Sequence, residues 1–338
     1  MASFLKNIVS RDKPKSGVLA AVAVISIGEM GLGVAKLLTN HRYQVLTNIE
    51  GRSENTYKRA ESASIDLVKT DTELAAQADY VLSIVPPKDA LATARRIATA
   101  ISAPDFPKRT APLYYLDLNA VSPNHVREIS NILKPLAEQV RFIDGGIIGG
   151  APTPKDPLDP SAKWKVPSMP MSGPHKLTDA TPSGDDLANL LNSKHISDEV
   201  GTASGLKMCF ASLTKGFQAI AVESFTTAHK LGVLPELQEQ LKLNSPATGQ
   251  MTQSITKMPP KAYRWVKEMK EIGETFAIDG GFSENENIFA AIAAVYNTIS
   301  KETDLGKEIT EKRKRGETVE DVAACMAEGL EKRRKVTD

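Results

Sequence analysis

The residues Ser26-Ile27-Gly28-Glu29-Met30-Gly31 form a glycine-containing turn between two segments of different periodicity. The segment before it, Gly17–Ile27, is rich in Val, Ala and Ile, as a buried strand is. The segment after it, Leu32–Leu38, has the apolar spacing of a helix. The order strand, tight turn, helix is how the dinucleotide-binding unit of doubly wound α/β domains begins.

The turn has the form S-x-G-x-x-G, with Ser26 at the position of the first glycine in the dinucleotide fingerprint G-x-G-x-x-G. Gly28 lets the backbone approach a pyrophosphate, and Gly31 lets the helix pack close to the strand. The helix N-terminus then faces the phosphate anion. We therefore expect the dinucleotide to be bound at Ser26, Gly28, Glu29, Met30 and Gly31.

The rest of the first half alternates strands with helices. The further predicted strands are Gln44–Thr47, Ile65–Val68, Tyr80–Val85, Leu113–Leu118 and Val140–Asp144. The predicted helices are Thr70–Ala78, Asp89–Ile101 and one that opens at Ser122-Pro123. We expect Ser122 to cap its helix, and either Asp71 or Thr72 to cap the earlier one. This alternation predicts a parallel sheet with helices on both faces.

A proline-rich stretch, Pro152–Pro174, follows the last of these strands. Its prolines exclude a helix and predict a surface loop with one short strand near Ser168–Ser172. Two interpretations stay open, an active-site flap and an ordinary connecting excursion. Beyond the stretch, we predict a helix at Leu187–Leu191 and a strand at His195–Val200.

From Gly205 onward every predicted element is a helix. These helices are Leu206–Leu231, Leu234–Leu243, Lys261–Phe276, Glu284–Lys301 and Val319–Lys332. We therefore predict a flexible arm at residues 1–16, a Rossmann-type domain at 17–200 and an all-α domain at 201–338. The basic clusters Lys312–Arg315 and Lys332–Lys335 are open to two interpretations, a nucleic-acid or nuclear-import patch and a solvated final helix.

The composition argues against several classes of protein. The 338 residues carry 42 Lys+Arg and 41 Asp+Glu, and this balance argues against a general binder of nucleic acids or anionic membranes. Two cysteines, Cys209 and Cys325, cannot form a disulfide framework, so we expect the reducing environment of the cytoplasm. The apolar stretches Val18–Ile27 and Ile288–Tyr296 are too short to span a bilayer. The histidines show no metal-ligand spacing, and we expect no metal site.

The end of the second predicted strand bears on the cofactor. Glu50 follows Gly31 at the interval of the acidic residue that binds a ribose hydroxyl, which indicates NAD. Arg52 and Ser53 come directly after it, and a guanidinium beside a hydroxyl suits a 2′-phosphate. We favour NADP over NAD on these two residues.

Five motifs in order resemble those of the β-hydroxyacid dehydrogenases and of their relative 6-phosphogluconate dehydrogenase, over roughly Val18 to Tyr296. They are Gly28–Gly31 for G-x-G-x-M-G, Ser83–Pro86 at the fourth strand, Asp117–Pro123 for D-x-S-T-x-x-P, Phe142–Gly150 for F-x-D-x-x-V-S-G-G, and Gly201–Lys207 for G-x-G-x-x-x-K. The resemblance implies hydride transfer between NAD(P) and a hydroxyl-bearing acid, and a dimer formed through the helical domain.

The resemblance also implies roles for single residues. Lys207 matches the lysine that acts as general acid/base at the carbonyl or hydroxyl. Asn119 stands at the first hydroxyl position of its motif, where we expect it to touch the cofactor and orient the reacting oxygen. Ile84, Val85 and Pro86 are expected to reach the nicotinamide ring.

Two departures from the family pattern change the expected substrate. Ile148 stands where the family has a serine that binds the substrate carboxylate, next to Gly149 and Gly150, and Ala211 stands where it has an asparagine. Both positions are apolar here, so a short hydroxy acid loses two hydrogen bonds. We expect a bulkier carbonyl compound or its alcohol.

Helical periodicity offers replacements for those lost contacts. At about 100° per residue, Thr214, Lys215 and Gln218 share a face with Lys207 and Ala211. Thr214 and Gln218 can hydrogen-bond a substrate. For Lys215 two interpretations stay open, a contact with a substrate carboxylate or phosphate, and a lysine that is solvated or pairs with an acidic side chain.

The sequence thus predicts an NADP(H)-dependent oxidoreductase that acts on a small molecule. Two alternatives stay open. One is an imine reductase on the same scaffold, although a retained lysine counts against it. The other is a dinucleotide-binding protein that has lost catalysis, which the apolar residues Ile148 and Ala211 favour.

Overall fold

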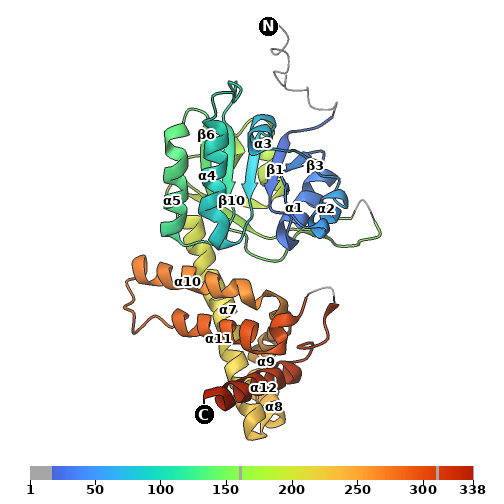
Figure 1. Ribbon diagram of the computed structural model, residues 1–338, viewed down its shortest axis with the longest axis vertical. Helices are drawn as coiled ribbons and strands as arrows, with labels where there is room; N and C mark the ends of the chain where they lie inside the picture. The colour runs from blue at the N-terminus through green and yellow to red at the C-terminus, as the bar shows by residue number, and fades with distance from the viewer. Residues whose placement is uncertain (1–16, 160–161, 310–311, 338) are drawn as a thin grey trace. The chain divides into compact units, whose positions relative to one another are not determined.

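The computed structural model describes residues 17–159, 162–309 and 312–337 (Figure 1), so the predicted arm, residues 1–16, lies outside the described residues. The chain divides into two compact units, Met1–Lys207 and Met208–Asp338. The first unit is an α/β domain and the second is helical, which is the predicted fold class. The long helix α7 (Thr202–Leu231) begins in the first unit and continues in the second.

The first unit is built on an eight-stranded sheet with the strand order β10-β9-β6-β5-β4-β1-β2-β3. Its strands are β1 (Ala21–Ile25), β2 (Gln44–Thr47), β3 (Asp66–Leu67), β4 (Tyr80–Ser83), β5 (Leu113–Asp117), β6 (Val140–Gly145), β9 (Met169–Ser172) and β10 (Ser193–Ser197). The strands from β1 to β6 run parallel, with β1 paired to both β2 and β4. Their carboxyl ends therefore lie at one edge of the sheet.

The prediction of a wholly parallel sheet is wrong at one side, because β9 runs antiparallel to β6. A parallel partner needs a crossover connection, usually a helix. The proline-rich connection from β6 to β9 instead contains a small hairpin of β7 (Thr153–Pro154) and β8 (Trp164–Lys165), and it brings the chain back antiparallel. The short strand predicted near Ser168–Ser172 is β9.

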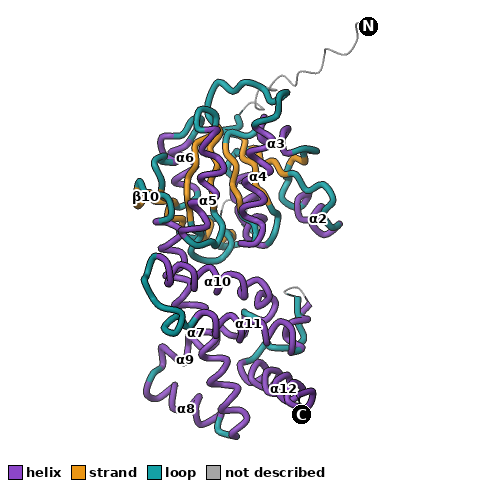
Figure 2. Tube along the Cα trace, turned by 60° about the vertical axis from the view of Figure 1, so that its left-hand side comes forward, coloured by secondary structure: helices purple, strands orange, loops and turns teal. Residues whose placement is uncertain are grey.

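Helices cover both faces of the sheet, as predicted. They are α1 (Glu29–Asn40), α2 (Glu54–Glu61), α3 (Asp71–Gln77), α4 (Ala90–Ile101), α5 (Pro123–Leu133) and α6 (Gly184–Leu190). One core joins α1 and α6 to the sheet through side chains such as Leu38 and Leu187. The other joins α4 and α5 through Ile97 and Ile129, and Figure 2 shows these two helices side by side over the strands.

The helix starts correct one expectation and confirm another. The hydroxyl of Ser122 caps α5, because it accepts a hydrogen bond from the amide of His125 at 3.1 Å. The cap of α3 is Thr70 rather than Asp71 or Thr72, and its hydroxyl accepts from the amide of Glu73 at 3.0 Å. A cap has extended backbone and lies one residue before the first helical residue, which is the position of Thr70.

The second unit is helical in its described residues. Besides α7 it contains α8 (Leu234–Asn244), α9 (Pro246–Thr252), α10 (Ala262–Ile278), α11 (Phe289–Glu302) and α12 (Val319–Thr337). Helices α10 and α11 pack against each other (Figure 1), and the ring of Trp265 meets that of Tyr296 edge-on at 5.3 Å. No helix in the described part of the chain is long and apolar enough to cross a membrane.

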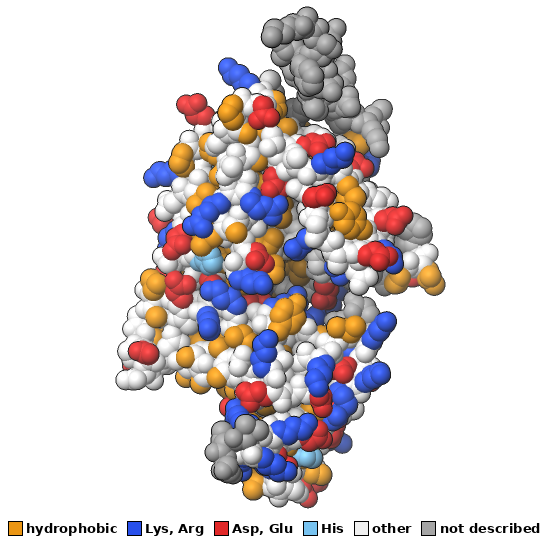
Figure 3. Space-filling model, viewed as in Figure 1, with side chains coloured by type: hydrophobic (Ala, Val, Ile, Leu, Met, Phe, Trp, Pro, Cys, Tyr) orange, Lys and Arg blue, Asp and Glu red, His pale blue; other side chains and the backbone are white. Residues whose placement is uncertain are grey.

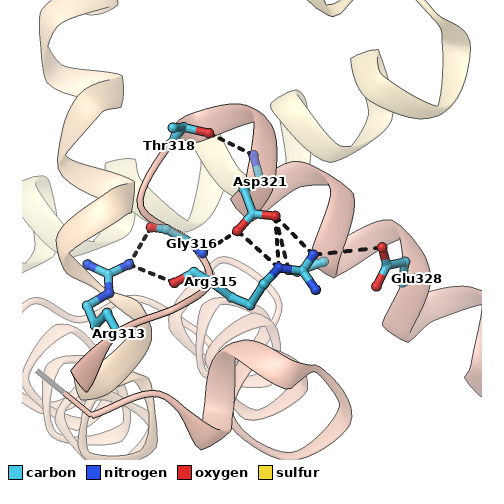
Figure 4. A network of polar contacts seen from close by, with 7 residues as sticks. Arg313, Arg315, Gly316, Thr318, Asp321 and Glu328 are labelled. Carbon is cyan, nitrogen blue, oxygen red and sulfur yellow. Dashed lines mark hydrogen bonds and ion pairs between the residues drawn. The ribbon is translucent and has the colours of Figure 1, made fainter.

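The loop before α12 uses part of a basic cluster inside the fold. The guanidinium of Arg315 donates to both carboxylate oxygens of Asp321, at 3.0 and 3.2 Å (Figure 4). Arg313 donates to the carbonyls of Thr256, Arg315 and Gly316. Two cations of the cluster Lys312–Arg315 are therefore structural. Elsewhere on the helical unit, Lys and Arg side chains lie among Asp and Glu on the face shown in Figure 3.

The two cysteines lie in different surroundings. Cys209 is exposed on α7, and Cys325 is buried in α12. Burial raises the pKa of Cys325 to about 11, and nearby Asp321 contributes to the rise. Both are free thiols.

Candidate functional site

The glycine turn has the geometry of a phosphate-binding loop. Its first position, Ser26, has a φ of 78°, in the left-handed region that favours glycine. A Cβ on Gly31 would lie 2.0 Å from the carbonyl oxygen of Ser26, so the fold itself requires glycine there. A Cβ on Gly28 would have no atom closer than 4.0 Å, so the space beside Gly28 is open to a ligand.

The start of α1 suits an anion. Gly28 is the N-cap residue and provides no side-chain cap, so no side chain at that position competes for the amides of the first turn. Glu29 is exposed and Met30 packs partly against the core of the first unit. The residues present therefore fit a dinucleotide pyrophosphate at Gly28.

The candidate 2′-phosphate residues lie at the carboxyl end of β2, the same sheet edge as the turn. A turn closes when the amide of Arg52 donates to the carbonyl of Ile49 at 3.0 Å. Glu50, Arg52 and Ser53 are all exposed, and Ser53 is the N-cap residue of α2. In the described part of the chain, the side chains of Glu50 and Arg52 form no ion pair.

The residues expected at the nicotinamide are held by a buried network. Asn119 is 2% exposed, and its amide oxygen accepts from the backbone amide of Val85 at 2.7 Å. Its amide nitrogen donates to Ser83 Oγ at 3.0 Å and to Asp117 Oδ2 at 2.8 Å. Both amide hydrogens of Asn119 are thus used inside the domain, where they fix the Ser83–Pro86 segment.

The sequence alone assigns no role to Asp117, whose carboxylate accepts a hydrogen bond from the side-chain amide of Asn119 in this network. It is fully buried, and burial raises its pKa to about 7. The neighbouring Asp144, its partner across β5 and β6, contributes to the rise. Asp117 belongs to the motif Asp117–Pro123, but only the fold shows that its carboxylate supports Asn119.

Lys207 lies on the first part of α7, with its side chain half-buried. Its amine donates to the carbonyl oxygen of Ile147 at 2.5 Å. Burial lowers the pKa of this amine to about 8. A Cβ on Gly146 would lie 2.9 Å from Cβ of Lys207, so glycine lets the helix approach the segment after β6.

The segment Ile148–Gly150 continues from that contact. Ile148 forms an isolated antiparallel bridge with Ser168, which joins the two ends of the proline-rich connection. Gly149 has a φ of 135°, a conformation that favours glycine, and Gly150 is exposed. The structure thus brings Lys207 to Gly146 and Ile147, which directly precede the segment in which we expected substrate contacts.

The remaining candidate residues belong to the part of α7 in the second unit. Ala211 is buried, and the hydroxyl of Thr214 donates back to carbonyls of its own helix. Lys215 forms an ion pair with Glu268, and its amine lies 4.8 Å from the ring centroid of Trp265. Of the two alternatives for Lys215, pairing with an acid is the one in the structure. The buried side-chain oxygen of Gln218 has no hydrogen-bond partner.

Two family models match parts of this chain. Residues 21–156 match the model of the NAD binding domain of 6-phosphogluconate dehydrogenase, and residues 228–299 match a domain of unknown function, DUF1932. An uncharacterized 28.5 kDa protein of Methanothermus fervidus is 30% identical over 223 residues, which are 65% of this chain and 76% of that protein. The chain belongs to the β-hydroxyacid dehydrogenase and 6-phosphogluconate dehydrogenase-like family.

Solved structures resemble this family member over most of their length. A conserved protein of unknown function, described as similar to 3-hydroxyacid dehydrogenases, is 25% identical with a TM-score of 0.56, over 83% of this chain and 96% of the other. A 3-hydroxyisobutyrate dehydrogenase from Salmonella typhimurium is 15% identical, with a TM-score of 0.59 over 90% and 99%. An imine reductase from Myxococcus stipitatus, in complex with NADP+, is 17% identical, with a TM-score of 0.50 over 82% and 92%. The last two share the fold.

Proposed function

We propose that this family member is an NADP(H)-dependent oxidoreductase that transfers hydride between the nicotinamide and a carbonyl or hydroxyl compound. The observation that carries the proposal is the Lys207 amine, which is half-buried, bonded to a backbone carbonyl and lowered in pKa to about 8. Such an amine exists in both protonation states near neutral pH and can exchange a proton with a substrate oxygen.

The cofactor would be held by the residues of the glycine turn and of the β2 end. Ser26 and the amides after Gly28 would take the pyrophosphate, and Arg52 with Ser53 would take a 2′-phosphate. When bound, the nicotinamide supplies or takes up the hydride. NAD is the alternative, and Glu50 supports it because a carboxylate accepts from ribose hydroxyls.

In the direction of reduction, the substrate carbonyl carbon receives the hydride while its oxygen takes a proton from the Lys207 ammonium. In the direction of oxidation, the neutral amine accepts the hydroxyl proton. We now propose a positioning role for Asn119, because its buried amide hydrogens are both donated within the domain. It would hold Val85 and Pro86 where the ring is expected.

The substrate we propose is a carbonyl compound or alcohol that is bulkier than a short hydroxy acid. Ile148 is partly exposed next to the segment that Lys207 contacts, and it provides apolar surface where the family has a serine. An apolar side chain favours a substrate group without hydrogen-bonding capacity at that point.

The test is turnover of NADPH over a panel of carbonyls, alcohols and imines. Lys207→Ala is expected to lower kcat/KM by about 100-fold or more, because a positioned general acid/base contributes that much. Lys194→Ala, an exposed lysine on β10, is the matched control and keeps full activity. Full activity of Lys207→Ala on a carbonyl contradicts the proton role.

The same panel separates the alternatives. Imine turnover that does not depend on Lys207 favours an imine reductase, the activity named for one structural neighbour. Tight NADPH binding without turnover of any class favours a protein that has lost catalysis.

We also infer a cytoplasmic location, where the exposed thiol of Cys209 stays reduced.

We further propose a homodimer formed through α7. Its side chains Phe210, Leu213 and Ile220 are 44, 75 and 54% exposed, and their spacing of three and seven residues makes an apolar stripe. Leu213→Glu is expected to convert a dimer to monomers in analytical ultracentrifugation. Leu158→Glu, which changes an exposed leucine of the first unit, keeps the dimer. A wild-type chain that sediments as a monomer contradicts this proposal.

A further inference from the structure

A buried carboxylate holds the beginning of the helix that carries Lys207. Asp144, in β6, is fully buried, and its Oδ2 accepts from the amides of Gly201 and Ser204 at 2.9 and 3.2 Å. Its Oδ1 accepts from the hydroxyl of Ser204 at 2.6 Å. A carboxylate at this place satisfies helix amides that would otherwise lack partners, and its charge suits the positive end of the helix.

A third element joins the same carboxylate. The hydroxyl of Ser172, at the end of β9, donates to Asp144 Oδ2 at 2.8 Å and accepts from the amide of Ala203 at 3.0 Å. The start of α7 is therefore tied to β6 and to β9 at once. Four donors converge on Asp144, and all of them belong to the first unit.

The same two segments meet again at Lys207. The carbonyl of Ile147, three residues after Asp144, accepts the lysine amine, and Gly146 allows the close approach between them. Along α7, Lys207 follows Ser204 by three residues, about one helical turn. A one-residue slip of the helix would rotate Lys207 by about 100° and break its contact with Ile147.

We propose that Asp144 is the positioning residue for Lys207: through Ser204, Ser172 and the first amides of α7, it sets the rotation and height of the helix so that the lysine amine faces the carbonyl of Ile147. The inference rests on the proposed function in one respect, that Lys207 exchanges the proton. The placement of the amine itself can be measured without any substrate.

The experiment compares Asp144→Asn with Asp79→Asn. Asp79 is a matched control, because it is also a buried carboxylate of the first unit and accepts a backbone amide, that of Ala21, at 3.0 Å. The ligand-free proteins are studied by hydrogen exchange of the amides in Gly201–Lys207 and by the pH dependence of chemical labelling of the Lys207 amine. Ser204→Ala, which removes one contact, covers the case in which Asp144→Asn does not fold.

We expect Asp144→Asn and Ser204→Ala to speed exchange in Gly201–Lys207 and to raise the apparent pKa of the Lys207 amine from about 8 toward its ordinary value. Asp79→Asn lowers thermal stability but leaves both readouts unchanged. In turnover, Asp144→Asn lowers kcat by about 10- to 100-fold, as expected of a misplaced catalytic group, without weakening NADPH binding.

The outcomes separate this inference from the proposed function. Unchanged exchange and labelling in both Asp144→Asn and Ser204→Ala overturn the positioning role, whether or not the protein turns over a substrate. If labelling of Lys207 changes in the two variants but wild type turns over no compound of the panel, the positioning role is supported and the proposed oxidoreductase is contradicted.

Discussion

Ser26 holds a backbone conformation that costs a non-glycine residue energy, with a φ of 78° at the turn where the fingerprint has glycine. Ser26→Gly is expected to raise the free energy of unfolding by about 0.5–1 kcal/mol, because it relieves this strain. Ser26→Ala keeps the strain and loses the hydroxyl. If the hydroxyl contacts a phosphate, both variants bind NADPH more weakly. Thermal melting and fluorescence titration measure the two effects, and a Ser26→Gly protein less stable than Ser26→Ala contradicts the strain argument.

Arg52 is the residue on which the proposed preference for NADP depends. Arg52→Ala is expected to weaken NADPH binding by about 10- to 100-fold, the effect of losing a charge-assisted hydrogen bond, and to leave NADH binding unchanged. Fluorescence titration with both cofactors measures this. Arg95→Ala, on the exposed side of α4, is the control. Equal losses for both cofactors would contradict 2′-phosphate recognition.

The proposed proton exchange by Lys207 predicts opposite pH profiles for the two directions of the proposed reaction. Reduction needs the ammonium, so kcat/KM is expected to fall as the pH rises through about 8. Oxidation needs the neutral amine, so kcat/KM is expected to rise through the same pH. Steady-state rates from pH 6 to 10 test this. Parallel profiles in the two directions would assign the proton to another group.

Among single residues, the order of the motifs predicts Lys207 and the glycine turn as candidate site residues, because residue type and spacing can be read from a sequence. It gave no role to Asp117 or Asp144, whose partners come from other elements. Lys215 shows the same limit, since its partner Glu268 is 53 residues away. Contacts between distant residues leave no periodic signal in a single sequence.

At the scale of elements, the loop before α12 depends on one ion pair. Arg315→Ala is expected to lower stability by about 1 kcal/mol, since both side chains are about one-third exposed and solvent weakens the pair. Arg315→Lys does not restore it, because an ammonium cannot match the two-oxygen contact with Asp321. Urea unfolding measures both. Lys332→Ala, an exposed residue of α12, is the control, and an Arg315→Lys variant as stable as wild type would contradict the argument.

The pair also gives a pH dependence. Hydrogen bonding from Arg315 lowers the pKa of Asp321. The stability it contributes is therefore present above the ordinary pKa of an aspartate and is lost as the pH falls through the lowered value. Wild type is expected to lose more stability on acidification than Asp321→Asn. Urea unfolding at several pH values gives the free energy of unfolding of both proteins. If it falls equally with pH in wild type and in Asp321→Asn, the pair contributes no stability.

Most elements were predictable, and the exceptions have physical causes. Helix α2 was missed because only Thr56 and Ala60 of its residues are buried, so it lacks an apolar stripe. Helix α9 was missed because it is short, and it begins at Pro246, separated from α8 by the single residue Ser245. The antiparallel direction of β9 was missed because a strand's residues do not record the direction of its neighbour.

At the scale of the whole molecule, composition and element order were enough to give an α/β domain followed by a helical one. The pattern changes from alternating strands and helices to helices alone, and this change follows from the backbone preferences of long segments. The surface stripe on α7 could not be found in this way. Apolar residues on a helix predict burial, and only the structure shows that Phe210, Leu213 and Ile220 are exposed.

The two cysteines differ in exposure, and this difference provides a selective labelling site in the natural sequence. Cys325 is buried with a raised pKa, whereas Cys209 is exposed, so a thiol-reactive dye should label Cys209 selectively. Cys209 lies about one helical turn before Leu213 on α7. Pyrene attached there would emit as an excimer only when two chains meet along this helix. Excimer emission from pyrene on Cys209 would therefore measure dimer formation without an engineered cysteine, at concentrations far below those that sedimentation needs.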